Sequence, residues 1–215
     1  MPVIPRYRPD VQLPPYGYVT GLWPHPLNHP EGHSHQSPHP LLSDPARQAD
    51  IFTVDPRPWS VEIPERQEFL YALDLFNHGY YWEAHEAWEG LWQAARKIPS
   101  PASLAPAEGL APAAILALFF QALIKLAAAG VKAREGRGVG VARHLRRAAE
   151  LLDLVTLRVA PREELWGLNL TELRHFSVKW RSIPLPPLVG REQPVLVVWP
   201  EQLRLRDLPL EGTPE

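Results

Sequence analysis

The sequence predicts an all-α protein: a compact array of helical hairpins, with a proline-rich irregular N-terminal arm and an extended C-terminal tail. Three observations predict this class. Fourteen of the 26 prolines lie in residues 1–64, where they exclude long helices. Four stretches within residues 65–155 repeat apolar residues at helical spacing. The apolar run 194–199 has no second run of its kind in the C-terminal third with which to pair.

The chain divides into three expected segments. Residues 1–64 form an arm or small irregular module, residues 65–160 a helical core domain, and residues 161–215 a C-terminal extension packed on the core. A length of 215 residues suffices for one large domain with an extension. Because prolines remove backbone donors from the arm, we expect residues 1 to about 60 to contribute little to stability.

Charge and cysteine content exclude several classes of protein. The 22 Lys and Arg are balanced by 24 Asp and Glu, so we expect no nucleic-acid partner. The absence of cysteine excludes disulfides, thiol catalysis and thiolate metal ligands. Prolines break the first fifteen residues, which lack the apolar core of a secretory signal. We therefore expect a cytoplasmic protein.

One apolar stretch, residues 110–131, is long enough to cross a bilayer. Gln121 and Lys125 stand near its middle, and alanine dominates over leucine. A lysine at mid-span costs about 2.5–3.5 kcal/mol on insertion into a membrane. The stretch is therefore expected to be a helix buried in the bundle, with no membrane as partner.

Two helices are predicted in the first half of the core domain. The first covers residues 65–79, because Pro64 precedes an acidic first turn and Gly79 follows the last apolar position. The second covers residues 80–97, and its side chains divide into two stripes at 100° per residue. The apolar stripe comprises Tyr81, Ala84, Trp88, Leu91 and Ala95. The mostly polar stripe comprises Trp82, His85, Glu86, Glu89, Gln93 and Arg96.

The second half of the core domain is predicted to be a helical hairpin. Residues 98–112 contain four prolines and form a long loop, interpreted as an insertion rather than a functional lid. Helices over residues 113–134 and 139–155 follow, joined by the glycine-rich turn 136–140.

Two short elements are expected near the C-terminus. Residues 170–180 are predicted to form a helix capped by Thr171. The run 194–199 is interpreted as a lone strand or an extended segment lying on the bundle.

The residues of the 80–97 helix and its surroundings resemble a known family. The motif FNHGYYWEAHEAWEGLW over residues 76–92, followed by FFQALI over residues 119–124, is similar to the bacterial and archaeal family called domain of unknown function 309. The resemblance covers about residues 66–155. It implies a compact all-α domain of helical hairpins in which the His85-Glu86 helix packs against the Gln121 helix, with no established reaction.

The polar stripe contains a candidate metal site. His85 and Glu89 are one helical turn apart and Glu86 is adjacent, so an imidazole and two carboxylates can converge. The pattern His85-Glu86-x-x-Glu89 is similar to the zincin helix with its second histidine replaced by glutamate. These ligand types suit zinc, manganese or iron, with His85 and Glu89 as ligands and Glu86 as the catalytic acid/base.

A structural interpretation of the same residues is preferred at this point. A histidine beside a tryptophan-rich face is often a core residue, with Glu89 and Gln121 as its hydrogen-bonding partners. A third alternative is a pocket for a ligand or partner, lined by Trp82, His85, Glu89 and Gln121. The preferred interpretation requires no cofactor.

Two further clusters have both a functional and an ordinary interpretation. The arm could bind divalent metals through five closely spaced histidines. They are His25, His29, His33, His35 and His39. The predicted hairpin turn carries basic residues that could meet phosphate or an acidic partner. They are Lys132, Arg134, Arg137, Arg143, Arg146 and Arg147. The ordinary interpretations are a proline-rich arm and a solvated helix face, and both are preferred.

Two classes of function therefore remain. The first is a binding or scaffold module with a pocket around His85, Glu86, Glu89 and Gln121, whose partner is a small molecule or a protein. The second is a hydrolase-like enzyme that uses a divalent metal ion at the same residues. The first is favoured because the metal-ligand set is incomplete. No pattern specifies a substrate or an oligomeric state.

Overall fold

The computed structural model describes residues 5–35, 64–97, 112–182, 188 and 190–206. Most of the interpreted loop 98–112 lies outside these residues, as does His39 of the arm. The two interpretations of that loop therefore stay predictions.

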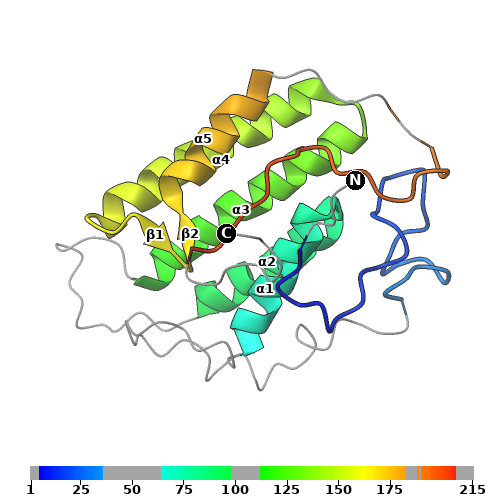
Figure 1. Cartoon of the computed structure of the whole chain (residues 1–215), viewed down its shortest axis with the longest axis horizontal. Helices are drawn as coiled ribbons and strands as arrows, with labels where there is room; N and C mark the ends of the chain where they lie inside the picture. Colours follow the sequence, from blue (N-terminus) through cyan, green and yellow to red (C-terminus); the bar gives the residue numbers. More distant parts are fainter. Residues whose placement is uncertain (1–4, 36–63, 98–111, 183–187, 189, 207–215) are drawn as a thin grey trace.

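Five α-helices and one very short β-hairpin form the regular structure of the described residues, which confirms the all-α prediction (Figure 1). The helices are α1 (Pro64–Asn77), α2 (Tyr81–Lys97), α3 (Pro112–Arg134), α4 (Gly138–Val159) and α5 (Leu170–Lys179). The first three helices match the predicted bounds closely, and α4 continues one turn beyond the predicted end. A single turn of 3-10 helix, Trp180–Ser182, follows α5.

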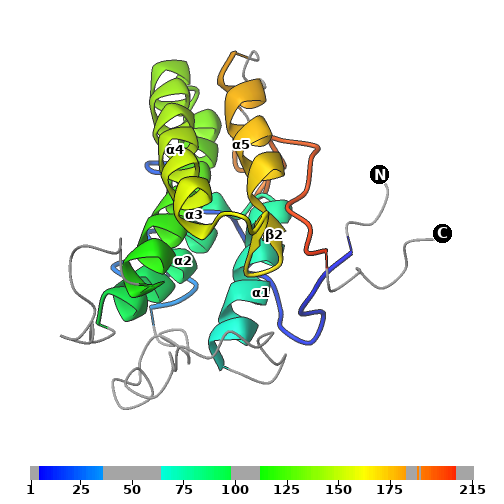
Figure 2. The ribbon, with the colours of Figure 1, turned by 90° about the vertical axis from the view of Figure 1, so that its left-hand side faces the viewer.

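The helix α3 packs between α2 and α4, and α5 packs against α4 (Figures 1 and 2). By length and composition α3 could cross a membrane, with a mean hydropathy of 2.1. In this fold, however, Phe119, Phe120 and Leu123 are completely buried among the other helices. The apolar side chains of α3 therefore pack in the core of the helical bundle.

Two glycines with positive φ make the tight turns between these helices. Gly79 (φ 89°) joins α1 to α2, and Gly136 (φ 69°) joins α3 to α4. A side chain at Gly79 would also meet the backbone of the tail, because its Cβ would lie 2.6 Å from the carbonyl oxygen of Leu196. Only glycine combines this conformation with this approach.

The arm residues 5–35 contain no helix or strand, as predicted, but they are tied to the core. The backbone amides of Tyr7 and Arg8 each donate to the buried carboxylate of Asp74 at 2.7 Å. The amide of Tyr18 donates to Glu83 at 2.9 Å. These contacts argue against the expectation that the arm adds little stability, because a buried carboxylate needs its donors.

The C-terminal part contains a hairpin that the sequence analysis did not predict. Strand β1 (Glu164–Leu165) pairs antiparallel with β2 (Leu168–Asn169) through a turn at Trp166 and Gly167, both with positive φ. The N-cap of α5 is Asn169, whose side chain accepts from the amide of Glu172 at 2.9 Å, and not Thr171 as predicted. Asn169 thus ends the strand and begins the helix.

The run 194–199 is extended but forms no strand, which agrees with a segment lying on the bundle. Trp199 is buried, with its ring 5.8 Å from Phe76, 5.3 Å from Tyr81 and 5.2 Å from Phe176. Aromatic packing on α1, α2 and α5 therefore holds the tail where strand pairing does not.

Candidate functional site

The polar stripe of α2 brings together three metal-ligand side chains. His85, Glu86 and Glu89 each offer a ligand atom, and these atoms lie within 4.8 Å of one another. His85 Nδ1 is 3.2 Å from Glu86 Oε1 and 3.7 Å from Glu89 Oε2. The other oxygen of Glu89 accepts a long 3.5 Å hydrogen bond from Gln93. The convergence expected from the spacing is therefore present.

The exposure of these side chains differs from that of a core network. The side chain of His85 is 26% exposed, that of Glu86 35% and that of Glu89 37%. Gln121 lies on α3, half-buried, and is not part of the three-residue group. The site is thus a half-buried surface cluster carried by one turn of α2, and solvent reaches all three residues.

Trp82 stands one turn before His85 but does not form an open pocket wall. The rings of Tyr18 and His25, both from the arm, pack edge-on against it with centroids 5.3 Å away. The arm therefore covers the tryptophan.

His144 on α4 is a neighbour of the cluster that the sequence analysis missed. Partial burial, followed by the positive charges of Lys125, Arg143 and Lys132 and a smaller contribution from His85, lowers its pKa to about 4. The imidazole is therefore neutral near pH 7. A Cβ at Gly140, one turn earlier on α4, would lie 3.0 Å from Lys132 Cγ, so this glycine lies against α3 in the register of the α3–α4 hairpin. That register decides which residues face His144, and sequence spacing alone does not supply it.

The described histidines of the arm are used in local structure. His33 Nε2 bonds to Glu83 Oε1 at 3.1 Å, with both side chains buried. The Nδ1 atom of His29 accepts from the amide of Glu31. Within the described part of the chain, no group of three converging ligands includes an arm histidine.

The basic residues around the α3–α4 turn are largely paired with neighbouring glutamates. Lys132 and Arg137 both contact Glu135, at 2.7 and 3.3 Å. Arg146 and Arg147 both contact Glu150, at 3.7 and 3.0 Å. This pairing suits the solvated helix face that the sequence analysis preferred.

One comparison with known proteins found a family that resembles part of the chain. The model described as Domain of unknown function (DUF309) matches residues 69–144, which include α2, α3 and the cluster. No curated protein and no solved structure matched the chain. The match lies within the range expected from the motifs in residues 76–92 and 119–124. Residues 69–144 of this chain are therefore similar to the family described as Domain of unknown function (DUF309).

Proposed function

We propose that this protein is a binding module that holds a divalent metal ion on α2 through His85, Glu86 and Glu89. The observation that carries the proposal is the convergence of their three ligand atoms within 4.8 Å on one helical turn. One imidazole nitrogen and two carboxylates form a ligand set that suits zinc, manganese or iron.

The distances between the ligand atoms support this assignment. Bonds of about 2.0–2.2 Å at a tetrahedral angle place two ligand atoms roughly 3.3–3.6 Å apart. The observed separations of 3.2 and 3.7 Å from His85 Nδ1 lie close to that range. Small rotations of Glu86 and Glu89 would suffice to surround an ion, which would replace any proton on Nδ1.

The exposure of the cluster favours binding over hydrolysis. The three residues supply three ligands, and their solvent-facing side leaves the remaining positions to water or to a group from a partner. In the hydrolase alternative Glu86 would act as acid/base and only His85 and Glu89 would hold the metal, one protein ligand fewer than the three of catalytic zinc sites. Hydrolysis at these residues stays a prediction, and binding is the function that we put forward.

Isothermal titration calorimetry of the full chain with zinc and manganese chloride tests the proposal. To remove competing imidazoles, the background carries His25→Gln, His29→Gln, His35→Gln and His39→Gln, while His33 is kept because it pairs with Glu83. We expect one site per chain. We also expect His85→Ala, Glu86→Gln and Glu89→Gln each to weaken binding at least tenfold, because the loss of supporting partners alone costs about 10–100-fold.

Matched controls come from the exposed faces of other helices. His175→Ala on α5 removes an exposed imidazole, and Glu150→Gln on α4 removes an exposed carboxylate. Both should bind like the background protein. Indistinguishable titrations for His85→Ala and His175→Ala would refute the site.

A further inference from the structure

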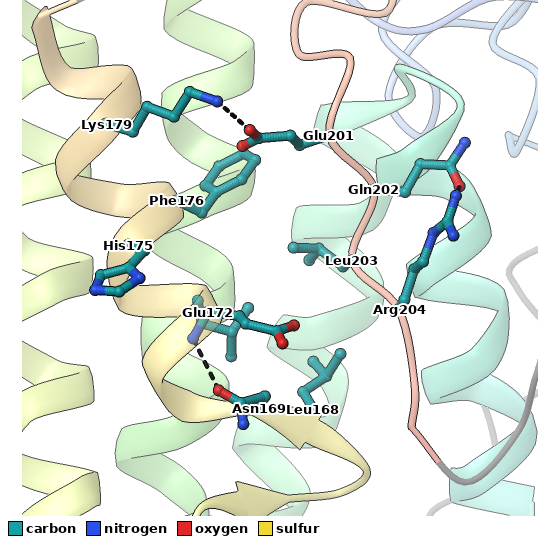
Figure 3. Close-up of a pocket in the computed structure, with 11 residues that line it drawn as sticks. Leu168, Asn169, Glu172, His175, Phe176, Lys179, Glu201, Gln202, Leu203 and Arg204 are labelled. Carbon is teal, nitrogen blue, oxygen red and sulfur yellow. Dashed lines mark hydrogen bonds and ion pairs between the residues drawn. The ribbon is translucent and has the colours of Figure 1, made fainter.

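The cavity between α5 and the tail carries side chains of both charges (Figure 3). It has a volume of about 320 Å³ and is lined by acidic and basic residues alike. Lys179 of α5 and Glu201 of the tail, for example, pair with each other. This cavity therefore selects no ligand by charge. The surface beside the α2 cluster differs, because it holds a positive charge that has no partner.

Between α2 and α4, one line of side chains on α3 reaches the surface. The other residues of 120–130 are buried, and the half-buried exceptions continue to residue 132 with the 4-3-4 spacing of a single helix face. They are Gln121, Lys125, Ala128 and Lys132. His144 on α4 is half-buried as well. The alignment of the three helices decides whether these side chains meet the α2 cluster.

The α2 cluster lies level with Lys125. A Cβ at Gly130 of α3 would lie 2.3 Å from the ring of Tyr81, so these two residues are in contact. Tyr81 begins α2, whereas Gly130 is near the end of α3, and two helices packed side by side from such a contact run antiparallel. His85 is one turn after Tyr81, and Leu126 is one turn before Gly130. His85 therefore lies beside Leu126 and its neighbour Lys125.

His144 reaches the same level from the other side of α3. The helices α3 and α4 form a hairpin, in which Gly140 of α4 lies against Lys132. His144 is one turn after Gly140, which brings it within one turn of Lys125 along the helix axis. After burial, the charges of Lys125 and His85 are among the causes that lower the pKa of His144, in agreement with this placement. Residues from three helices therefore meet on one face.

The charges on this face leave Lys125 without a counterion. No ion pair or side-chain hydrogen bond joins its ammonium group to another residue in the described part of the chain. Lys132, in contrast, bonds to a neighbouring glutamate at 2.7 Å. The negative charges of Glu86 and Glu89 are neutralised by one divalent ion, and His144 is neutral near pH 7. With the ion bound, Lys125 is the half-buried cation left unpaired, so the next ligand is expected to carry one negative charge.

We propose that a carboxylate completes this site, with one oxygen on the ion held by the α2 cluster and the other on the ammonium group of Lys125. This inference rests on the ion site proposed above. Three protein ligands leave one position of a tetrahedral site open. A carboxylate has two accepting oxygens, so it can bridge the ion and the ammonium group. The neutral ring of His144 can donate its one N–H to the same group.

Isothermal titration calorimetry with manganese chloride tests the carboxylate on the background protein used above. Titrations are made in about 0.1 M sodium acetate and in sodium chloride of the same ionic strength. Acetate binds free manganese equally in every titration, so the variants are compared with one another. In chloride, Lys125→Gln should bind manganese at least as tightly as the background, because a positive charge near the ion is removed. The change to acetate should raise the affinity of the background about threefold or more relative to Lys125→Gln.

A second arm distinguishes the two sources of a carboxylate. Acetyl-Gly-Gly replaces acetate and presents the carboxylate at the end of a peptide chain. A larger gain in affinity with acetyl-Gly-Gly would support the chain end of a partner protein as the source. The same gain with both probes would support a free carboxylic acid.

Two further variants are matched controls. Lys125→Arg keeps the charge and should keep the acetate effect, and Lys132→Gln removes a cation that is already paired and should keep it too. An equal response of the background and Lys125→Gln to acetate would overturn the carboxylate and leave the ion site standing. Loss of the effect in Lys132→Gln as well would indicate general attraction of anions and would also overturn it. Absence of manganese binding in chloride would refute both proposals.

Discussion

At the scale of single residues, three carboxylates buried in α1 and α2 meet three different environments. Asp74 accepts two backbone amides from the arm, and Glu83 accepts one amide and the ring of His33. Burial raises the pKa of Glu68 to about 8, and the positive charge of Arg8 lowers it only in part. The fold therefore holds Glu68 protonated at neutral pH.

The protonation of Glu68 predicts how stability changes with pH. Between about pH 4.5 and about pH 8 the folded chain keeps a proton on Glu68 that the unfolded chain has lost. Stability therefore falls as the pH rises through this window, by up to about 1.4 kcal/mol per pH unit. Glu68→Gln mimics the protonated form, so its free energy of unfolding should lack this pH-dependent decrease.

Urea unfolding of both proteins at several pH values measures the effect. The free energy of unfolding of Glu68→Gln should increase relative to wild type from about pH 4.5 to about pH 8. The difference between the two proteins isolates Glu68 from other titrating groups such as His144. Parallel pH profiles would show that Glu68 is ionised in the folded state.

The candidate cluster was predictable at this scale, because His85, Glu86 and Glu89 belong to one helix whose period is known. Their exposure was not predictable, since it depends on what α3 and α4 leave uncovered. His144 was missed for a related reason. Only the register of two helices against each other places it near Lys125 and His85, and no spacing along the chain carries that information.

At the scale of elements, the four helices of the core domain were predictable because apolar repeats and glycine turns are local signals. The β-hairpin was not, because each strand has only two residues and is too short for any alternation. The cap of α5 was assigned to Thr171 instead of Asn169, because both residue types favour N-caps and only the backbone conformation distinguishes them.

The crossing of α2 and α3 depends on Gly130. A Cβ at this position would overlap the ring of Tyr81, which is itself fully packed. We expect Gly130→Ala to lower the free energy of unfolding by about 1–3 kcal/mol, because overpacking outweighs the roughly 1 kcal/mol gained in helix propensity. Thermal and urea unfolding measure the change.

Gly140→Ala is the matched control for this prediction. Its Cβ would meet the stem of Lys132 at 3.0 Å, and a partly exposed lysine can move aside. The control should therefore change stability less than Gly130→Ala does. The same loss in both variants would mean that backbone effects common to helical glycines, and not the Tyr81 contact, determine the result.

At the scale of the whole molecule, the arm is predicted to be part of the folded unit. A protein lacking residues 1–35 would leave Asp74 and Glu83 without their donors. We expect the free energy of unfolding to fall by several kcal/mol, since each unsatisfied buried group costs about 1–3 kcal/mol and a charged one more. Urea unfolding of the full and shortened chains measures this difference.

A double-mutant comparison identifies the cause. Asp74→Asn should destabilise the full chain, because its amide group replaces one of the two accepting oxygens with a donor. In the shortened chain the same change removes an uncompensated charge, so it should be neutral or stabilising. The same cost in both backgrounds would show that the arm does not act through Asp74.

The hydrogen bonds between the tail and the first two helices have a consequence for the timing of folding during synthesis. Asn77 and Tyr81 are buried residues of the first two helices. Their hydrogen-bond partners, however, are backbone atoms of Leu203 and Val198, more than 100 residues later in the chain. A ribosome adding about 5–20 residues per second takes roughly 6–25 s to travel from Asn77 to Leu203. During that interval the nascent helices hold polar groups whose native partners have not yet been made. The core is therefore complete only after residues 198–203 have been synthesised.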